Sequence, residues 1–288
     1  MKILITGGFG QLGTSVYYRL IDSFDIIRTG RVKPPGVEGV EMDLRDGTKV
    51  RQVIKLFKPD IILHLGAMTN VDECELNPYI AREVNIAGTG HLCEAFSGKI
   101  IYISTDYVFD GHAGPYSEDA KVCPINVYGQ TKLASEQIVL LQNNNNLIIR
   151  GNVLYDYSNN SGASFLNWVI KSLKNSTEIQ VVNDQINNPT WTHSLADIIS
   201  MCIIKNISGL YHWADLDIIN RYDFAMAIAE VFSLNQNLIK SISTMDLNQP
   251  AMRPLQSGLI SDKIANILQV RQPTINECLE QIKQNMIK

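Results

Sequence analysis

The sequence has few features that would suit a nucleic-acid-binding, membrane or exported protein. Its 25 Lys and Arg against 29 Asp and Glu give a net charge of -4, without a run of like charges. This balance argues against a surface for nucleic acids or anionic membranes. No segment approaches the roughly 18 apolar residues that span a bilayer, and Met1–Thr6 lacks the layout of a signal peptide. These absences predict a cytoplasmic protein with no nucleic-acid and no membrane partner.

Disulfide patterns and metal-ligand spacings are also lacking. The five cysteines are an odd number, lie far apart and include no C-x-x-C pair, which is the usage expected in a reduced compartment. None of the five histidines is spaced from another, or from a cysteine, as metal ligands are. His64 follows the apolar residues 61–63, so we expect a hydrogen-bonded histidine at a strand end. The sequence therefore predicts no metal site.

Short apolar runs alternate with helical patterns in the first half of the chain. The runs, which are typical of parallel strands buried on both faces, cover 2–6, 26–29, 61–65, 100–104 and 147–150. The helical patterns between them cover 11–20, 48–57, 80–96 and 127–141. This alternation predicts an α/β fold with a Rossmann-type, doubly wound parallel sheet. We assign residues 1–150 to it as an NAD(P)-binding domain.

The pattern changes after Arg150. Residues 156–164 are polar and loop-like, and 165–173 form an amphipathic helix in which we expect Trp168 to be a core residue. A further helix is expected over 222–232. Residues 151–288 are therefore predicted to form a smaller C-terminal α/β substrate lobe, some of whose segments return to the sheet.

A glycine-rich turn, Gly7-x-x-Gly10-x-x-Gly13, joins the first predicted strand to the first predicted helix. Glycine permits a tight turn, a close approach of the backbone to a pyrophosphate and close packing of the helix on the sheet. The free N–H groups at the helix start would then face the phosphates. A glycine turn alone can be a plain βα connection, but its position predicts dinucleotide binding.

The residues after the second strand indicate which dinucleotide is preferred. Two cations, Arg28 and Arg31, occupy the region where an acidic residue would bind the ribose 2′-hydroxyl of NAD. Positive charge suits a 2′-phosphate, so NADP(H) is preferred and NAD(H) is the alternative. Asp43 could accept a hydrogen bond from the adenine or cap the helix that begins near Thr48. Both roles for Asp43 stay open.

Tyr128 and Lys132 are the strongest chemical signal. Residues four apart on a helix share one face, so the ammonium can act on the phenol. Free tyrosine titrates near ~10, and a nearby cation favours its ionised form. A hydroxyl from Thr105 or Ser104 at a strand end could hold a carbonyl. This combination predicts a carbonyl reductase.

These motifs resemble those of the extended short-chain dehydrogenase/reductases and, among them, the dTDP-4-dehydrorhamnose reductase family. The matching segments cover nearly the whole chain and are 7–13, 104–111, 124–133 with Glu136, 182–185, 189–190, 209–212 and 253–254. The resemblance implies NAD(P)H-dependent reduction of the C4 keto group of a nucleotide-linked 6-deoxy-4-hexulose. The implied conversion is dTDP-4-dehydrorhamnose to dTDP-rhamnose, for cell-surface polysaccharide biosynthesis.

The resemblance also implies a role for individual residues. Tyr128 would protonate the oxyanion, and Lys132 would hold the nicotinamide ribose and lower the pKa of the phenol. Thr105 would hydrogen-bond the carbonyl, and Asp106 would also touch the sugar. The implied cofactor-binding residues are Gly7, Phe9, Gly10, Gln11, Leu12, Asp43, Leu44, Ala67, Met68 and Thr69.

The chain departs from the family pattern on the substrate side. Val153 stands where the family has a tryptophan that packs on the substrate, so a stacking surface is lost there. Arg253 could bind the substrate diphosphate, or tie its loop to the lobe through a carboxylate. The acidic residues of the metal-bridged dimer seen in some members are not found here, which leaves a homodimer without metal open.

Two alternatives remain from the sequence. A dehydratase or epimerase of the same superfamily is one, but a dehydratase needs an extra acid beside Thr105, and Tyr107 follows Asp106 here. The other is a non-catalytic, NADP-binding regulatory subunit, because residues 211–213 and 221–226 also resemble the beta subunit of methionine adenosyltransferase. That subunit keeps a similar Tyr/Lys helix, so the intact pair does not distinguish the two.

Overall fold

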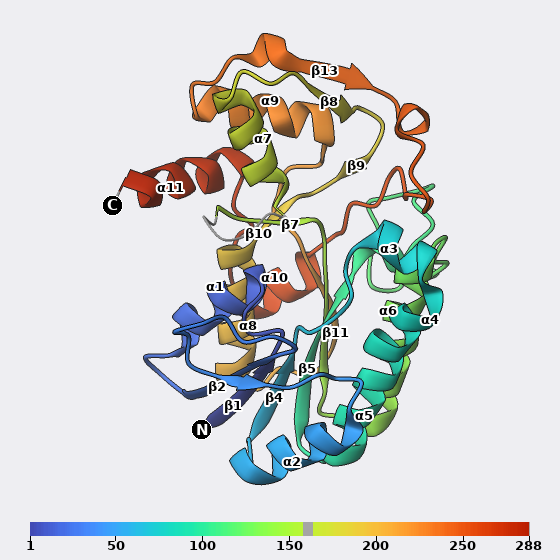
Figure 1. Ribbon diagram of the computed structural model, residues 1–288, viewed down its shortest axis with the longest axis vertical. Helices are drawn as coiled ribbons and strands as arrows, with labels where there is room; N and C mark the ends of the chain where they lie inside the picture. The colour runs from blue at the N-terminus through green and yellow to red at the C-terminus, as the bar shows by residue number, and fades with distance from the viewer. Residues whose placement is uncertain (158–163, 288) are drawn as a thin grey trace.

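The computed structural model describes residues 1–157 and 164–287. Seven parallel strands form the central sheet in the order β11-β6-β5-β4-β1-β2-β3 (Figure 1). They are β1 (Lys2–Thr6), β2 (Asp25–Gly30), β3 (Val40–Glu41), β4 (Ile61–His64), β5 (Lys99–Thr105), β6 (Leu147–Gly151) and β11 (Gly209–Trp213). The strand order reverses direction between β1 and β4, which is where doubly wound folds bind ligands. The predicted Rossmann-type sheet is confirmed.

Helices cover both faces of this sheet (Figure 1). Because side chains alternate across a strand, Ile3 and Ile5 enter one core while Leu4 enters the other. The first face carries α1 (Gln11–Leu20), α8 (Thr192–Ile204) and α10 (Asp262–Leu268). The second face carries α2 (Gly47–Phe57), α5 (Gly88–Ala95) and α6 (Val127–Gln142). The apolar runs of the sequence are thus buried on both sides.

The second half of the chain contributes to the sheet as well as to a separate lobe. Strand β11 pairs along β6, with Gly209 opposite Leu147 and Trp213 opposite Gly151. Helix α8 packs on α1, and its Leu195 and Ile199 lie in the same core as Ile3. Helix α8 and strand β11 of the second half therefore belong to the layers around the central sheet and not to the lobe.

The lobe lies beyond the carboxyl ends of the strands (Figure 1). Its helices are α7 (Phe165–Lys174), α9 (Arg221–Val231) and α11 (Ile275–Ile287). Its strand pairs are β7 (Leu154–Tyr155) with β10 (Thr190–Trp191), β8 (Ile179–Val182) with β13 (Ile239–Ile242), and β9 (Ile186–Asn187) with β12 (Ile219–Asn220). Its core includes Val169, Phe224 and Leu279. No helix in the described part of the chain is long and apolar enough to cross a membrane.

One local expectation was wrong. Trp168 is 40% exposed, because α7 turns Leu166, Val169, Ile170 and Leu173 toward the lobe core and leaves Trp168 beside that face. The helix expected over 80–96 is present as a continuous helical segment made of α4 (Pro78–Arg82), a π-helical turn η1 (Glu83–Ala87) and α5, and only the π-helical turn was not expected.

Short elements complete the chain. They are α3 (Val71–Leu76) and three 3₁₀ turns, η2 (Asp106–Val108), η3 (Gln236–Leu238) and η4 (Thr244–Leu247). Turn η2 follows β5 directly, and Thr105 caps it by accepting a hydrogen bond from the Tyr107 backbone N–H at 3.3 Å. The strand end that carries Thr105 and Asp106 is thereby held in place.

Candidate active site

A cavity of about 1070 Å³ lies at the carboxyl ends of the strands, between the sheet and the lobe. One end is formed by the glycine turn and by residues 42–45. The middle is formed by residues 65–69, 103–107 and α6, and the far end by residues of the lobe. Its position at the reversal of strand order is the expected ligand site of this architecture.

The glycine turn has the geometry of a phosphate cradle. Gly7 has a φ of +67°, and a Cβ there would lie 2.8 Å from the Gly66 nitrogen. A Cβ on Gly13 would overlap the Gly7 carbonyl oxygen. Helix α1 begins after Gly10 without a side-chain cap, so its first N–H groups can serve an anion in the cavity. Gly7, Gly10, Gln11 and Leu12 all line the cavity.

The two arginines after the second strand have different surroundings. Arg31 lines the cavity, and Arg28 does not. The Arg28 guanidinium lies 3.8 Å above the ring centre of Tyr17 and 5.5 Å from that of Phe9. Phe9 is likewise absent from the cavity wall, because its ring packs against Gly30 and Gly39. The expected cofactor contacts of Phe9 and Arg28 therefore lack support in the geometry.

Asp43 and its neighbours form the wall beside Arg31. Arg45 Nη2 lies 2.6 Å from Asp43 Oδ2, and this hydrogen bond holds the pKa of Asp43 below its ordinary value. Helix α2 is capped by Asp46, which accepts from the Lys49 backbone N–H at 2.9 Å. The capping role considered for Asp43 is thus wrong, and Asp43, Leu44 and Arg45 line the cavity.

The segment after β4 brings Ala67, Met68 and Thr69 to the cavity wall. It is held by a residue that the sequence reasoning missed, Asn85 in the π-helical turn η1. Asn85 Oδ1 accepts from the Met68 N–H at 2.7 Å, and its Nδ2 donates to the Met68 carbonyl at 3.1 Å. π-Helical turns often occur at functional sites, but no sequence period indicated this one.

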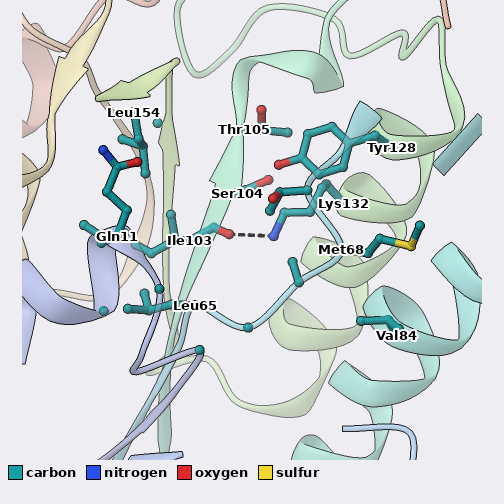
Figure 2. A pocket seen from close by; sticks show the side chains of 18 of the residues that line it. Gln11, Leu65, Met68, Val84, Ile103, Ser104, Thr105, Tyr128, Lys132 and Leu154 are labelled. Atoms are coloured by element: carbon teal, nitrogen blue, oxygen red, sulfur yellow. Dashed lines mark hydrogen bonds between the residues drawn. The ribbon is translucent and has the colours of Figure 1, made fainter. Parts of the chain in front are cut away.

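Tyr128, Lys132 and Thr105 are brought together in the middle of the cavity. Figure 2 shows the phenol of Tyr128 and the hydroxyls of Thr105 and Ser104 directed toward one region, with the Lys132 ammonium beside it. The Asn126 side chain caps α6 by accepting from the Gly129 N–H at 2.8 Å. Lys132 Nζ donates to the Ile103 carbonyl at 2.7 Å. The ammonium is therefore fixed at the end of β5.

Ser104 and Asp106 flank Thr105. The Ser104 hydroxyl is buried, lines the cavity and has no hydrogen-bond partner within the described residues. Asp106 Oδ2 accepts from the Ser257 hydroxyl at 2.6 Å, and Oδ1 accepts from the Thr105 hydroxyl at 3.0 Å. A hydroxyl has one proton, so Thr105 must turn away from Asp106 to donate to a carbonyl. Ser257 would then remain bound to the carboxylate.

Burial dominates the protonation of the central groups. It raises the pKa of Tyr128 well above its ordinary value, and a hydrogen bond with Thr105 opposes this only in part. It lowers the pKa of Lys132 to about 7, against the opposing effect of Glu136. Burial also raises the pKa of Asp106 to about 6. The expected lowering of the Tyr128 pKa is therefore not found, because desolvation of the phenol outweighs nearby charge.

The lobe closes the far end of the cavity with Asn152, Val153, Phe165 and Arg221. Arg221 was not predicted from the sequence, and its only signal was a cation at the predicted start of a helix.

Arg253 is not at the cavity wall. Its Nη2 lies 2.7 Å from Asp72 Oδ2, and its Nη1 donates to the Ala251 carbonyl at 2.9 Å. Of the two roles considered for Arg253, the geometry therefore supports the ion pair with a carboxylate and not the contact with the substrate diphosphate.

Other polar residues considered from the sequence have structural partners. His64 is buried, with Nδ1 at 2.7 Å from the Thr6 hydroxyl and Nε2 at 3.0 Å from that of Thr89, which confirms a hydrogen-bonded histidine at a strand end. Burial lowers its pKa to about 3. Within residues 1–157 and 164–287, no three His, Cys, Asp or Glu side chains are grouped as metal ligands.

Comparison with known proteins gives consistent matches over the chain. The model of the RmlD substrate binding domain family matches residues 1–287. A dTDP-4-dehydrorhamnose reductase from Aggregatibacter actinomycetemcomitans is 32% identical over 98% of this chain and 98% of that protein. The crystal structure of dTDP-4-dehydrorhamnose reductase from Bacillus anthracis in complex with NADP has a TM-score of 0.90, with 30% identity and 99% coverage of both chains. The methionine adenosyltransferase 2 subunit beta from Xenopus tropicalis is 30% identical over 84% of this chain and 75% of that protein.

Proposed function

The chain belongs to the RmlD substrate binding domain family, and from this membership we propose that it is an NADPH-dependent nucleotide-sugar 4-ketoreductase. Its substrate would be dTDP-4-dehydrorhamnose and its product dTDP-rhamnose, for polysaccharide biosynthesis. The observation that carries the proposal is the gathering of Tyr128, Lys132 and Thr105 in a cavity whose other end is the glycine turn. One site can thus hold a dinucleotide and a carbonyl together.

The chemistry requires one hydride and one proton for each carbonyl. Bound NADPH would supply the hydride to C4 of the sugar. Tyr128 donates its phenol proton to the C4 oxygen, which becomes a hydroxyl. The raised pKa of Tyr128 keeps the phenol protonated at neutral pH, and the Lys132 ammonium stabilises the phenolate that remains. The Thr105 hydroxyl donates to the carbonyl oxygen and orients it.

The cofactor would lie along the first-domain side of the cavity. We assign the pyrophosphate to Gly7, Gly10, Gln11 and Leu12, and the adenosine to Asp43 and Leu44. Ala67, Met68 and Thr69 would contact the middle of the cofactor. Arg31 places positive charge near the adenosine end, where Arg45 is paired with Asp43, and this charge supports NADP(H) over NAD(H). Residues 1–150 would thus bind the cofactor, and the lobe within 151–288 would bind the substrate.

The test is oxidation of NADPH at 340 nm by the purified protein. dTDP-4-dehydrorhamnose should be reduced, and the corresponding GDP and UDP 4-keto sugars show how far the nucleotide is selected. Replacing NADPH with NADH measures cofactor preference, and light scattering tests for a homodimer. Failure to consume NADPH with any of these sugars, despite tight NADPH binding, would overturn the reductase.

A second candidate is a regulatory subunit. It is favoured by the similarity to the methionine adenosyltransferase 2 subunit beta, which extends over 84% of this chain. A pull-down with a methionine adenosyltransferase catalytic subunit distinguishes the two. Absence of binding removes this candidate, and binding without turnover of keto sugars would establish it in place of the reductase.

A further inference from the structure

The cavity has more positive charge than the proposed cofactor site uses. Among the described residues, the Lys and Arg side chains that line it are Arg31, Arg45, Lys132 and Arg221. Arg31 and Arg45 lie near Asp43, and Lys132 lies beside Tyr128. Arg221 alone comes from the lobe, where it is the first residue of α9. The far end of the cavity thus carries its own cation.

The Arg221 guanidinium is held by an aromatic ring and has no carboxylate partner. It lies 5.4 Å above the ring centre of Phe165, and no Asp or Glu within residues 1–157 and 164–287 is within ion-pair distance of it. The intervening residues 158–163 carry no acidic side chain. Its charge nevertheless reaches the centre of the cavity, where burial raises the pKa of Asp106 and Tyr107 and the Arg221 guanidinium opposes part of that rise.

Phe165 is itself fixed by neighbouring rings. Its ring stacks on Phe224 with centres 5.5 Å apart and planes 18° apart. Trp168 lies at 5.6 Å on the same helix. Because Phe165 also lines the cavity, the pair presents an apolar ring and an unneutralised guanidinium to whatever occupies the far end.

Arg253 shows the opposite arrangement. Its side chain is 9% exposed and pairs with Asp72, so its charge is already neutralised. A dianionic group entering the far end would therefore meet Arg221 and not Arg253. A guanidinium binds two phosphate oxygens through parallel N–H bonds, which matches the diphosphate that links a nucleoside to its sugar.

We propose that Arg221, supported by Phe165, binds the diphosphate of the nucleotide-linked substrate. This inference rests on the proposed function for the identity of the sugar, and adds the group that the lobe recognises. It makes the enzyme select phosphate-linked sugars over free sugars, because a free sugar offers no phosphate oxygens to the guanidinium fork while its keto group lies at Tyr128.

The test is calorimetric binding of dTDP, dTMP and thymidine to protein saturated with NADP⁺. Arg221→Met should weaken dTDP binding by about 10- to 100-fold, as expected for loss of charged hydrogen bonds, and leave thymidine unchanged. Arg221→Lys keeps the positive charge without the two parallel N–H donors of the guanidinium, and its dTDP affinity should fall less than that of Arg221→Met. The control is Lys171→Met, which removes an exposed cation of α7 away from the cavity. Equal NADP⁺ affinity and melting temperature show that each variant is folded.

Three outcomes would overturn the inference. They are no dTDP binding by the unchanged protein, an unchanged dTDP affinity in Arg221→Met, and a loss in Arg253→Met that Arg221→Met does not show. Binding of dTDP is measured without turnover, so the two proposals fail separately. Loss of dTDP binding in Arg221→Met together with no reduction of keto sugars supports the subsite and removes the reductase. If Arg221→Met still reduces the keto sugar with an unaltered KM for it, the reductase is supported and the Arg221 subsite is removed.

Discussion

At the residue scale, spacing in the sequence predicted which side chains line the site but not the direction in which their pKa values are shifted. Tyr128 and Lys132 were predicted from their four-residue spacing, and both line the cavity. The sign of the Tyr128 pKa shift was wrong, because spacing reports neighbouring charge and says nothing about desolvation. Arg221 was missed for a related reason. The role proposed for it depends on its having no Asp or Glu partner within residues 1–157 and 164–287, and local sequence does not show which side chains meet in the fold.

The loss of one phenol should separate chemistry from binding. Tyr128→Phe removes the proposed proton donor while keeping the ring that packs edge-on against Tyr107. We expect kcat to fall by about 10²- to 10⁴-fold, with little change in NADPH affinity, in steady-state assays and fluorescence titration. Tyr211→Phe, which removes a phenol from β11, is the control. Retention of most of the turnover by Tyr128→Phe would exclude this tyrosine as the proton donor.

Lys132 should make stability depend on pH. Burial lowers its pKa from 10.5 to about 7 in the folded, cofactor-free protein. Between these values the unfolded chain binds more protons, so the free energy of unfolding should rise with pH across this window. In urea denaturation from pH 7 to pH 9, Lys132→Met should show a smaller rise than the unchanged protein.

The exposed Lys171 supplies the comparison for this experiment. Lys171→Met should keep the full pH dependence, because its ammonium is not buried. Parallel stability curves for Lys132→Met and the unchanged protein would mean that Lys132 stays charged in the folded state.

At the element scale, regular periods predicted most of the helices and strands, but not the irregular turn inside one helix. The expected helix over 11–20 coincides with α1, and the expected strand over 2–6 coincides with β1. The segment 80–96 was read as one helix, because its apolar residues repeat at helical spacing. A π-helical turn replaces i→i+4 by i→i+5 hydrogen bonds over a single turn inside an α-helix, and no residue pattern in the segment indicated it. The structure shows this turn in the backbone of Glu83–Ala87 and shows that its Asn85 bonds the backbone of Met68.

The π-helical turn should matter for cofactor binding. Asn85→Ala removes the two bonds to the Met68 backbone and a third, from Nδ2 to the Thr131 hydroxyl at 2.9 Å. Because Met68 lines the cavity and its N–H would be left unpaired, NADPH affinity should fall by about 10-fold. Fluorescence titration measures this. Asn77→Ala, at the start of α4 and outside the cavity wall, is the control, and equal affinities in both variants would contradict a positioning role.

At the scale of the whole molecule, alternation predicted the layers, and long-range contacts decided how the lobe is attached. The sequence indicated that part of the second half returns to the sheet, but not that β11 would pair with β6. The sequence also did not show whether the Arg253 guanidinium binds the phosphates of a substrate or a carboxylate of the protein. The choice depends on Asp72, which is 181 residues away in the chain. Pairings over such separations leave no local pattern.

The tie between Arg253 and Asp72 should therefore stabilise the fold more than it assists substrate binding. The segment around it is also held by Asp72 Oδ1, which accepts from the Ala251 N–H at 3.2 Å, and by Asn126, which donates to the Met252 carbonyl at 2.8 Å. Arg253→Met leaves the Asp72 carboxylate without its charged partner, which should lower the free energy of unfolding by about 1–3 kcal/mol.

A double-mutant cycle separates this contact from the rest of the loop. Asp72→Asn alone should also destabilise the protein, and the double variant should lose less than the sum of the single losses, because the pair interacts directly. Urea denaturation provides the three values, and dTDP affinity of the folded variants should stay close to that of the unchanged protein. Additive losses in stability would show that the two side chains act independently. A dTDP affinity that falls with Arg253 alone would return the diphosphate to this arginine.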